Sequence, residues 1–417
     1  MVSIPTGLRF HGRCLWAGLP LACSLTLGAC WRTAALSSTQ DSFLPIPTPP
    51  PPLPSPSGTP GLPPWWPREQ GSPYAAVLSG FLQGLAAEGG ALSQQGILLW
   101  TAEGKLLAEH LLDQPLPVGP LDQLALSLMA LETWGYEHRF QTHFFTTGYR
   151  LGQRLIGDLV VVGGGDPYFR EANVAELARH LHSLGIRQID GEVKVVPPFR
   201  LLGQPDALAS ARRLAQLLRD PQQPYPVAIS GSGSTLEELP AELHCLAGYT
   251  SLPLGSLLHI LNSSLDRAMA GALLAELGGP RALVEYLRQR LVAEPAAHLD
   301  ASLLPAAAEI RLEGQELYLS PRALAHLWQH LVAATEGNPT RILPVAGISP
   351  GALQLRTLPP STVAQVGSAP RRLMLLGQLP DGTSFVLLNH GPDLASLRQH
   401  QDQFLQQVLA VGKSLSR

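Results

Sequence analysis

The chain has 417 residues, 45% hydrophobic and 15% charged, and this length and composition suit about two or three globular domains. Its formal net charge of -3 gives no broad attraction for nucleic acid or for an anionic membrane surface, so we expect no nucleic-acid partner. Nearly all the basic residues are arginines, and the lysines are limited to Lys105, Lys194 and Lys413. Chemistry that needs a lysine must therefore use one of these three.

The first 29 residues are typical of an export signal. Basic residues precede the apolar stretch 15–29, which is too short, and too broken by Pro20, to span a bilayer. The stretch ends in Leu27-Gly28-Ala29-Cys30, a pattern similar to a bacterial lipobox, in which the cysteine thiol receives a diacylglycerol. We expect residues 1–29 to be removed and Cys30 to anchor the protein to a membrane in the periplasm. The alternative is ordinary cleavage beside an unmodified cysteine.

Neither the cysteines nor the histidines predict a cross-link or a metal site. The two cysteines of the signal would leave with it and Cys30 would carry lipid, so Cys245 would have no disulfide partner. His180 and His182 face opposite sides of an expected helix, and the chain contains no H-E-x-x-H or C-x-x-C motif. We therefore expect no internal disulfide, no metal and no cofactor.

A proline-rich segment follows the signal. Residues 45–67 hold twelve prolines and cannot pack a core, so we expect 30–72 to be an extended polyproline-II tether. Helical periodicity then begins at Tyr74 and ends before Gly89-Gly90. The elements expected next are two strands and a helix, at 96–100, 105–110 and 122–134.

The middle of the chain alternates short strands with one clear helix. We expect strands at 142–148, 158–162 and 187–196 and a helix at 173–184, whereas 203–245 gives no clear pattern. Two amphipathic helical stretches follow, at 253–277 and 279–292, and Ser320-Pro321 opens another helix. A hairpin of 373–377 and 384–389 and a helix over 394–411 close the chain. This order predicts an α/β domain whose sheet takes strands from both ends of the chain.

Several stretches resemble the S13, or PBP4-type, D-alanyl-D-alanine carboxypeptidases. The most specific is Leu155-Ile-Gly-Asp-Leu-Val-Val-Val-Gly-Gly-Gly-Asp-Pro167. In family order around it lie Leu131-Glu-Thr-Trp-Gly135, Tyr249-Thr-Ser-Leu-Pro-Leu254, Leu343-Pro-Val-Ala-Gly347 and Asn389-His-Gly391. The resemblance implies a transpeptidase-like domain, an antiparallel sheet flanked by helices, over 73–140 and 245–412. It also implies an inserted, mostly-β domain over 141–244. The three glycines before Asp166 themselves read as a tight turn.

The same resemblance implies three catalytic motifs, and the first is absent. Penicillin-binding enzymes use an S-x-x-K serine and lysine as nucleophile and base. This position falls on Pro120-Leu-Asp-Gln123, and shifting the alignment by one residue gives Gly119 and Asp122. The residues three before the lysines are Ala102, Gly191 and Ala410, so no S-x-x-K occurs anywhere in the chain. The resemblance therefore implies a nucleophile and a base that this chain does not supply.

The other two motifs are altered as well. The S-x-N position falls on Leu265-Asp-Arg267, and the Lys-Thr-Gly position falls on Gln365-Val366-Gly367, which keeps only the glycine. Arg267 and Gln365 are candidates to hold a ligand carboxylate, although an arginine at a helix start is also common on a bare surface. Gly347-Ile-Ser-Pro-Gly351 matches G-x-S-x-G, but Pro350 lacks the N–H that an oxyanion hole requires. Ser127, inside a helix, reads as a packing residue.

These observations predict an S13 homologue of the cell envelope that has lost catalysis. It would bind peptidoglycan stem peptides or an envelope protein through the altered cleft and reach the membrane through its lipid. The alternatives are residual serine-type D-Ala-D-Ala carboxypeptidase or endopeptidase activity, and a purely structural envelope lipoprotein.

Overall fold

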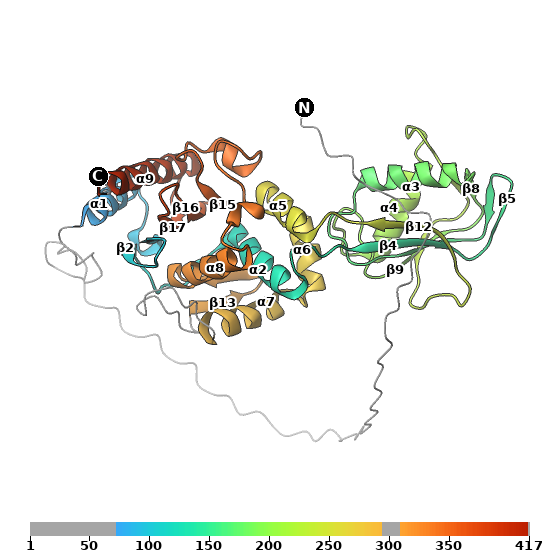
Figure 1. Cartoon of the computed structure of the whole chain (residues 1–417), viewed down its shortest axis with the longest axis horizontal. Helices are drawn as coiled ribbons and strands as arrows, with labels where there is room; N and C mark the ends of the chain where they lie inside the picture. Colours follow the sequence, from blue (N-terminus) through green and yellow to red (C-terminus); the bar gives the residue numbers. More distant parts are fainter. Residues whose placement is uncertain (1–71, 294–308, 416–417) are drawn as a thin grey trace, which may run out of the picture. The chain divides into compact units, whose positions relative to one another are not determined.

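The structure is a computed structural model, of which we describe residues 72–293 and 309–415 (Figure 1). The expected signal peptide, Cys30 and the proline-rich tether lie outside these residues and stay predictions. None of the described helices is both long and apolar enough to cross a membrane.

One antiparallel sheet joins strands from both ends of the described chain, as the sequence predicted. Its strand order is β15-β16-β17-β1-β2. β1 pairs with β17 from Gly96 opposite Leu388 to Trp100 opposite Ser384, so the late hairpin holds the first strand in place. The strands are β1 (Gly96–Trp100), β2 (Leu106–His110), β15 (Val363–Ala369), β16 (Arg372–Gln378) and β17 (Ser384–His390).

Helices cover both faces of this sheet (Figure 1). Alternation along β17 sends Phe385 and Leu387 to one face, where they pack with α1 and α9. Val386 and Leu388 point to the other face and pack with α2 and α8. The helices are α1 (Pro73–Ala87), α2 (Asp122–Trp134), α8 (Pro321–Ala334) and α9 (Leu394–Leu415).

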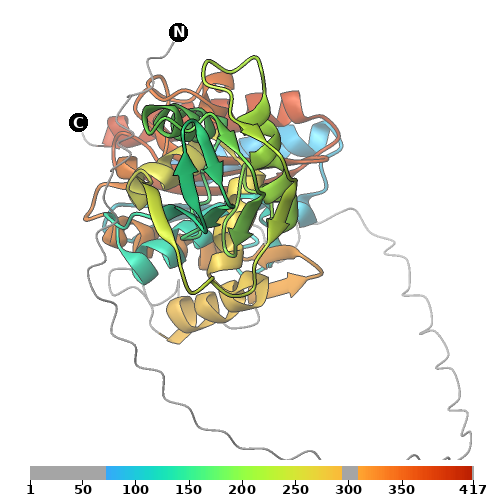
Figure 2. The same cartoon turned by 90° about the vertical axis from the view of Figure 1, so that its right-hand side faces the viewer.

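Residues 141–250 build two further sheets, drawn mainly in green in Figure 2. Their strand orders are β11-β9-β7-β4-β12 and β10-β8-β6-β5. A third hydrophobic core, drawn from positions 144–249 alone, packs these sheets against α3 and α4. The elements are β4 (Gln141–Thr146), β5 (Tyr149–Leu151), β6 (Arg154–Ile156), β7 (Leu159–Val162), α3 (Glu171–Ser183), β8 (Gln188–Ile189), β9 (Val193–Val196), α4 (Ala207–Arg219), β10 (Ala228–Ile229), β11 (Gly233–Thr235) and β12 (His244–Thr250). The domain boundaries given above remain predictions.

The glycines after β7 allow backbone segments to touch. A Cβ atom on Gly163 would lie 2.4 Å from Cα of Phe199, and one on Gly164 would lie 2.3 Å from the carbonyl oxygen of Gln141. Only a residue without a side chain permits these approaches. Asp166 then accepts a hydrogen bond of 2.8 Å from the backbone N–H of Tyr168. The interpretation of this motif as a structural turn is confirmed.

Further elements lie on either side of residues 141–250: β3 and η2 precede them, and α5, α6, α7, β13 and β14 follow them. Helices α5, α6 and α7 follow one another, and a small sheet has the strand order β13-β14-β3. A short 3-10 helix, η2, leads directly into α2. The bounds are β3 (Leu116–Pro117), η2 (Gly119–Leu121), α5 (Leu254–Ser264), α6 (Arg267–Glu276), α7 (Gly279–Leu287), β13 (Ile310–Glu313) and β14 (Glu316–Leu319).

The structure divides two elements that the sequence predicted as single. The expected strand 187–196 is β8 in one sheet and β9 in another, because a turn at Gly191 packs against the backbone of Gly157. The expected helix 253–277 is split into α5 and α6. Leu265 takes a left-handed conformation with φ 56°, and the Asp266 carboxylate then accepts a hydrogen bond from Met269 N–H and starts a new helix.

Cys245, in β12, is disulfide-bonded. The expectation of no internal disulfide is therefore wrong for the full chain. It rested on the expectation that the other cysteines leave with the signal or carry lipid.

Candidate ligand-binding cleft

The S-x-x-K position lies at the start of α2, where η2 turns into the helix. Pro120 is inside η2, where its missing N–H costs nothing because no helical partner is required there. Gln123 lies in the first turn of α2 and is only 3% exposed, and its Oε1 has no hydrogen-bond partner among the described residues. Neither side chain offers a nucleophile or a base.

The S-x-N position lies where α5 ends and α6 begins. Leu265 is the left-handed residue between the helices, and Arg267 is the first residue of α6 and is exposed. Arg267, Ala270, Gly271 and Leu274 face the same cleft, which is the i, i+3, i+4, i+7 stripe of one helix face. The guanidinium of Arg267 makes no hydrogen bond and no ion pair within the described part of the chain.

The Lys-Thr-Gly position lies on β15, an edge strand of the main sheet. Val366 belongs to the core beneath α1 and α9, so alternation turns Gln365 and Gly367 toward α2. A Cβ atom on Gly367 would lie 3.2 Å from Cδ of Pro120, which puts the two motif positions in contact. Gln365 is 0% exposed, and neither atom of its amide has a hydrogen-bond partner among the described residues. The structure therefore does not bring Gln365 and Arg267 to one surface.

These elements surround a cleft of about 670 Å³. Its walls come from η2, the start of α2, α6, α7, the β13–β14 hairpin and the turn between β15 and β16. No serine, threonine, cysteine, lysine or histidine is among the described residues that line it. The lining residues are Gly119, Pro120, Asp122, Gln123, Leu126, Arg267, Ala270, Gly271, Leu274, Pro280, Leu283, Val284, Leu312, Glu313, Gln315, Glu316, Leu317, Ala369, Pro370 and Arg372.

Charges of both signs stand around this apolar lining. Arg372 forms an ion pair of 2.7 Å with Glu316, so its charge is already compensated. Burial raises the pKa of Asp122 from 3.8 to about 6, although a hydrogen bond from the Gln123 backbone and the charge of Arg267 both act to lower it. Asp122 therefore ionises only above about pH 6, and near pH 7 its carboxylate and the guanidinium of Arg267 attract each other across the cleft.

Comparison with known proteins agrees with this architecture. Residues 80–196 match the model of the D-Ala-D-Ala carboxypeptidase 3 (S13) family. The resemblance to the S13 family is thus found again in this part of the chain. None of the curated proteins compared matches it.

Solved structures of a penicillin-binding protein and of a predatory endopeptidase share the fold of this chain. Penicillin-binding protein 4 (dacB) from Haemophilus influenzae, complexed with a β-lactam, is similar with a TM-score of 0.59 and 16% identity, over 79% of this chain and 99% of that one. A predatory endopeptidase from Bdellovibrio bacteriovorus, in complex with an immunity protein, is similar with a TM-score of 0.55 and 14% identity, over 76% and 91% of the two chains. At such identities the likeness shows a shared fold.

The other serines considered above make structural hydrogen bonds. Ser127 is 0% exposed, and its hydroxyl accepts a hydrogen bond of 3.2 Å from Nδ2 of Asn262. Ser349, in the G-x-S-x-G match, accepts a hydrogen bond of 2.9 Å from the backbone N–H of Val345. Lys194 pairs with Asp158 at 2.8 Å in the inserted region, and no lysine is among the described residues lining the cleft.

Asp122 is the feature of this cleft that the sequence did not reveal. An acidic residue in the first turn of a helix is normally a favourable partner of the helix dipole, and by itself it does not indicate a functional site. Its burial beside Arg267 depends on how α6 packs across the start of α2, which local pattern does not show.

Proposed function

We propose that this chain is a non-catalytic S13 homologue of the cell envelope that binds the D-alanyl-D-alanine end of a peptidoglycan stem peptide. The observation that carries the proposal is Arg267. It is a guanidinium without an ion pair among the described residues, at the edge of a cleft whose described lining holds no nucleophile. A peptide carboxylate is the group that such an arginine binds best, through paired N–H···O bonds.

The remainder of the cleft suits the methyl groups of such a peptide. Leu274 and Ala270 extend from Arg267 along α6, and Leu283 and Val284 of α7 continue the apolar lining. Small apolar side chains gain about 0.8 kcal/mol for each methylene-sized group removed from water. In this arrangement binding comes from one charge-assisted contact and a short apolar surface, and no covalent step follows.

An envelope protein is the alternative ligand of the same cleft. It is favoured by one observation, namely that a structurally similar Bdellovibrio endopeptidase was solved in complex with an immunity protein. A protein would engage the cleft through a projecting loop or terminus, and Arg267 would again meet its carboxylate. Residual peptidase activity would instead require a nucleophile that the described lining of the cleft does not offer.

Calorimetric titration of the purified chain with a pentapeptide ending in D-alanyl-D-alanine tests this proposal. We expect saturable binding, no hydrolysis of the peptide, and affinity lowered about tenfold by Arg267→Ala, since a hydrogen bond to a charged group contributes roughly 1.5–3 kcal/mol. Arg281→Ala is the matched control, because Arg281 is an exposed arginine at the start of nearby α7 that lies outside the cleft.

Two outcomes would contradict the proposal. Release of D-alanine at a rate that follows enzyme concentration would show that the chain is a peptidase. Equal affinity of wild type and Arg267→Ala would show that the carboxylate is held elsewhere or not at all. Binding of a protein fraction from the envelope, displaced by the peptide, would select the alternative ligand.

A further inference from the structure

A second pocket lies in the inserted region, among residues that the proposed cleft does not use. It has a volume of about 550 Å³ and is lined by Arg179, His182, Ser183, Arg187, Pro224, Tyr225 and Pro226. One wall is the C-terminal turn of α3 with the residues after it, and the other is the loop between α4 and β10. The pocket is therefore assembled from two separate segments of the chain.

The lining is basic and contains no carboxylate. Arg187 is exposed, and its guanidinium makes no hydrogen bond or ion pair with any other described residue. Arg179 donates to Glu176 on its own helix and adds a cation that is partly compensated. Arg150 donates to the carbonyl oxygen of Leu184, which brings a third guanidinium to this end of α3. An oxyanion would find several donors here and little repulsion.

The opposite wall presents an aromatic ring held in position. Tyr225 is 40% exposed and stands edge-on to His182, with ring centres 5.4 Å apart. Nε2 of His182 donates a hydrogen bond of 2.9 Å to the carbonyl oxygen of Pro226. Prolines on both sides of Tyr225 restrict its backbone, which limits the conformations of this loop before any ligand arrives. Exposed aromatic faces of this kind stack on the apolar face of a flat or ring-shaped ligand.

We propose that this pocket binds an anionic saccharide, with Tyr225 against the sugar ring and Arg187, supported by Arg179, on its carboxylate or phosphate. The hydroxyl group of Tyr225 lies among these residues and can meet sugar hydroxyls, and that of Ser183, which donates to the carbonyl oxygen of His180, can accept from them. A bare oxyanion would use the arginines alone and leave the ring without a role. A neutral sugar would use the ring and leave Arg187 without a partner.

The experiment is a ligand-observed NMR titration of the full chain with four probes. N-acetylmuramic acid carries a carboxylate, N-acetylglucosamine 6-phosphate carries a phosphate, and N-acetylglucosamine and inorganic phosphate each supply half of the proposed ligand. We expect at least one anionic sugar to bind about tenfold more tightly than both half-ligands, and comparison of the two anionic sugars identifies the preferred charge.

Variants assign the binding to this pocket. Arg187→Ala should weaken the anionic sugars about tenfold and leave the neutral sugar unchanged, whereas Tyr225→Ala should weaken all the sugars and not phosphate. Arg212→Ala is the matched control, because Arg212 is an exposed arginine of α4 outside the pocket. Phosphate binding as tightly as the sugars, no binding of either anionic sugar, or an Arg187→Ala variant that behaves as wild type would each overturn the proposal. The D-alanyl-D-alanine peptide should not displace the sugar, so the two proposals can fail independently.

Discussion

Gly367 of β15 and Pro120 of η2 are in direct contact, because a Cβ atom on Gly367 would lie 3.2 Å from Cδ of Pro120. The same atom would lie 3.3 Å from Cε of Met374 and 3.4 Å from the backbone nitrogen of Leu121. Two positions that the sequence analysis assigned to catalytic motifs are thus parts of one apolar contact. The contact favours glycine at position 367, because a side chain there would crowd Pro120.

Gly367→Ala should therefore lower stability, by about 1 kcal/mol, because the added methyl group crowds three neighbours. Gly80→Ala provides the contrast, since Gly80 lies inside α1 and has no atom within 4 Å of an added Cβ. That variant should raise stability by roughly 0.5–1 kcal/mol through helix propensity. Urea denaturation of both variants measures the difference. If Gly367→Ala and Gly80→Ala changed the free energy of unfolding equally and in the same direction, the contact between Gly367 and Pro120 would be loose.

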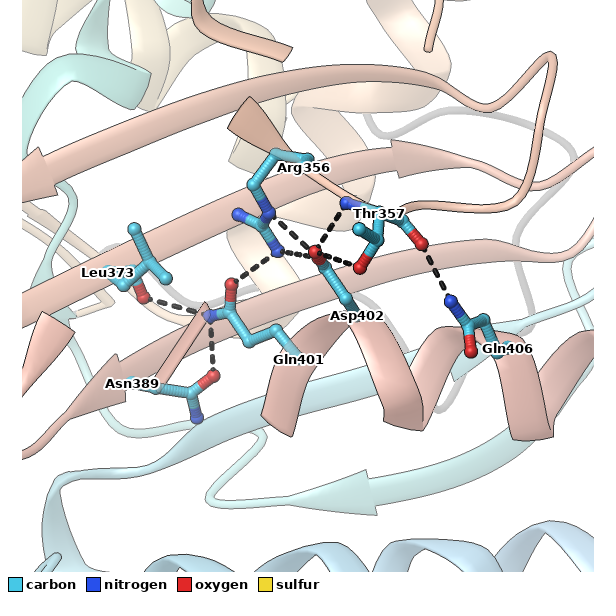
Figure 3. Close-up of polar contacts among 7 residues, drawn as sticks. All are labelled: Arg356, Thr357, Leu373, Asn389, Gln401, Asp402 and Gln406. Atoms are coloured by element: carbon cyan, nitrogen blue, oxygen red, sulfur yellow. Dashed lines mark hydrogen bonds and ion pairs between the residues drawn. The ribbon is translucent and has the colours of Figure 1, made fainter. Parts of the chain in front are cut away.

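Two buried glutamines should respond in opposite ways to loss of the amide. Gln365 and Gln401 are both 0% exposed, but only Gln401 is bonded, donating to Asn389 Oδ1 at 2.7 Å and accepting from Arg356 at 3.0 Å (Figure 3). Gln365→Met should raise stability or leave it unchanged, because it removes a buried amide without partners. Gln401→Met should lower stability by about 1–3 kcal/mol. Destabilisation by both variants to the same extent would mean that Gln365 is satisfied as well.

The network around Gln401 also contains a buried ion pair that holds α9 to the loop before β15. Arg356 and Asp402 are 2.6 Å apart, with side chains 1% and 3% exposed, and Asp402 also accepts from the backbone and hydroxyl of Thr357 (Figure 3). Asp402→Asn should lower stability by about 3–5 kcal/mol, because it leaves a buried guanidinium without its counter-charge. Thermal melting measures the effect. It is applied to the single variant Asp402→Asn and to the double variant that combines Asp402→Asn with Arg356→Met. The double variant should recover part of the loss, and failure to recover any would contradict the ion-pair explanation.

Asp122 gives the cleft a measurable pH dependence. Its pKa is raised from 3.8 to about 6 in the folded protein, chiefly by burial. As pH rises, the unfolded chain therefore releases this proton at a lower pH than the folded protein does. The contribution of Asp122 to stability therefore falls as pH rises from about 4 to about 6, and stays constant above that range. Asp122→Asn should raise the free energy of unfolding near pH 7.5 by up to about 3 kcal/mol and change it little near pH 4. An effect of equal size at both pH values would contradict the raised pKa.

Lipid attachment at Cys30 is tested by cell fractionation. The wild-type protein should partition with membranes, and Cys30→Ser should move it to the soluble periplasmic fraction. A wild-type protein that is already soluble would show that the Leu27-Gly28-Ala29-Cys30 pattern does not act as a lipobox.

Sequence reasoning predicted the elements with strong local signals. Ser320-Pro321 opens α8 with a side-chain cap on Ala323 N–H, and the turn at Pro380-Asp-Gly-Thr383 joins β16 to β17, both as expected. The β5–β6 hairpin was missed because each of its strands has only three residues, too few to show alternation. The burial of Gln365 and the half-buried position of Asp122 were missed for another reason. Both depend on contacts between segments far apart in the chain, which no local pattern carries.

Restoring the first motif alone should not restore catalysis. Pro120→Ser with Gln123→Lys would supply a nucleophile and a base, but Arg267 and Gln365 would still stand where the other two motifs are expected. Hydrolysis of a D-alanyl-D-alanine peptide by this double variant should stay near the level of the wild type. A large gain would show that the rest of the cleft is still arranged for acyl transfer.

Intact-mass spectrometry after incubation with a β-lactam tests the central claim most directly, because acylation reports a working nucleophile whatever the natural ligand is. The account predicts that the mass of the full chain stays unchanged after prolonged exposure to excess benzylpenicillin, under conditions in which the D-alanyl-D-alanine peptide still binds. A stoichiometric increase by the mass of one β-lactam would contradict it, and would show that a nucleophile acts in this chain without the S-x-x-K motif.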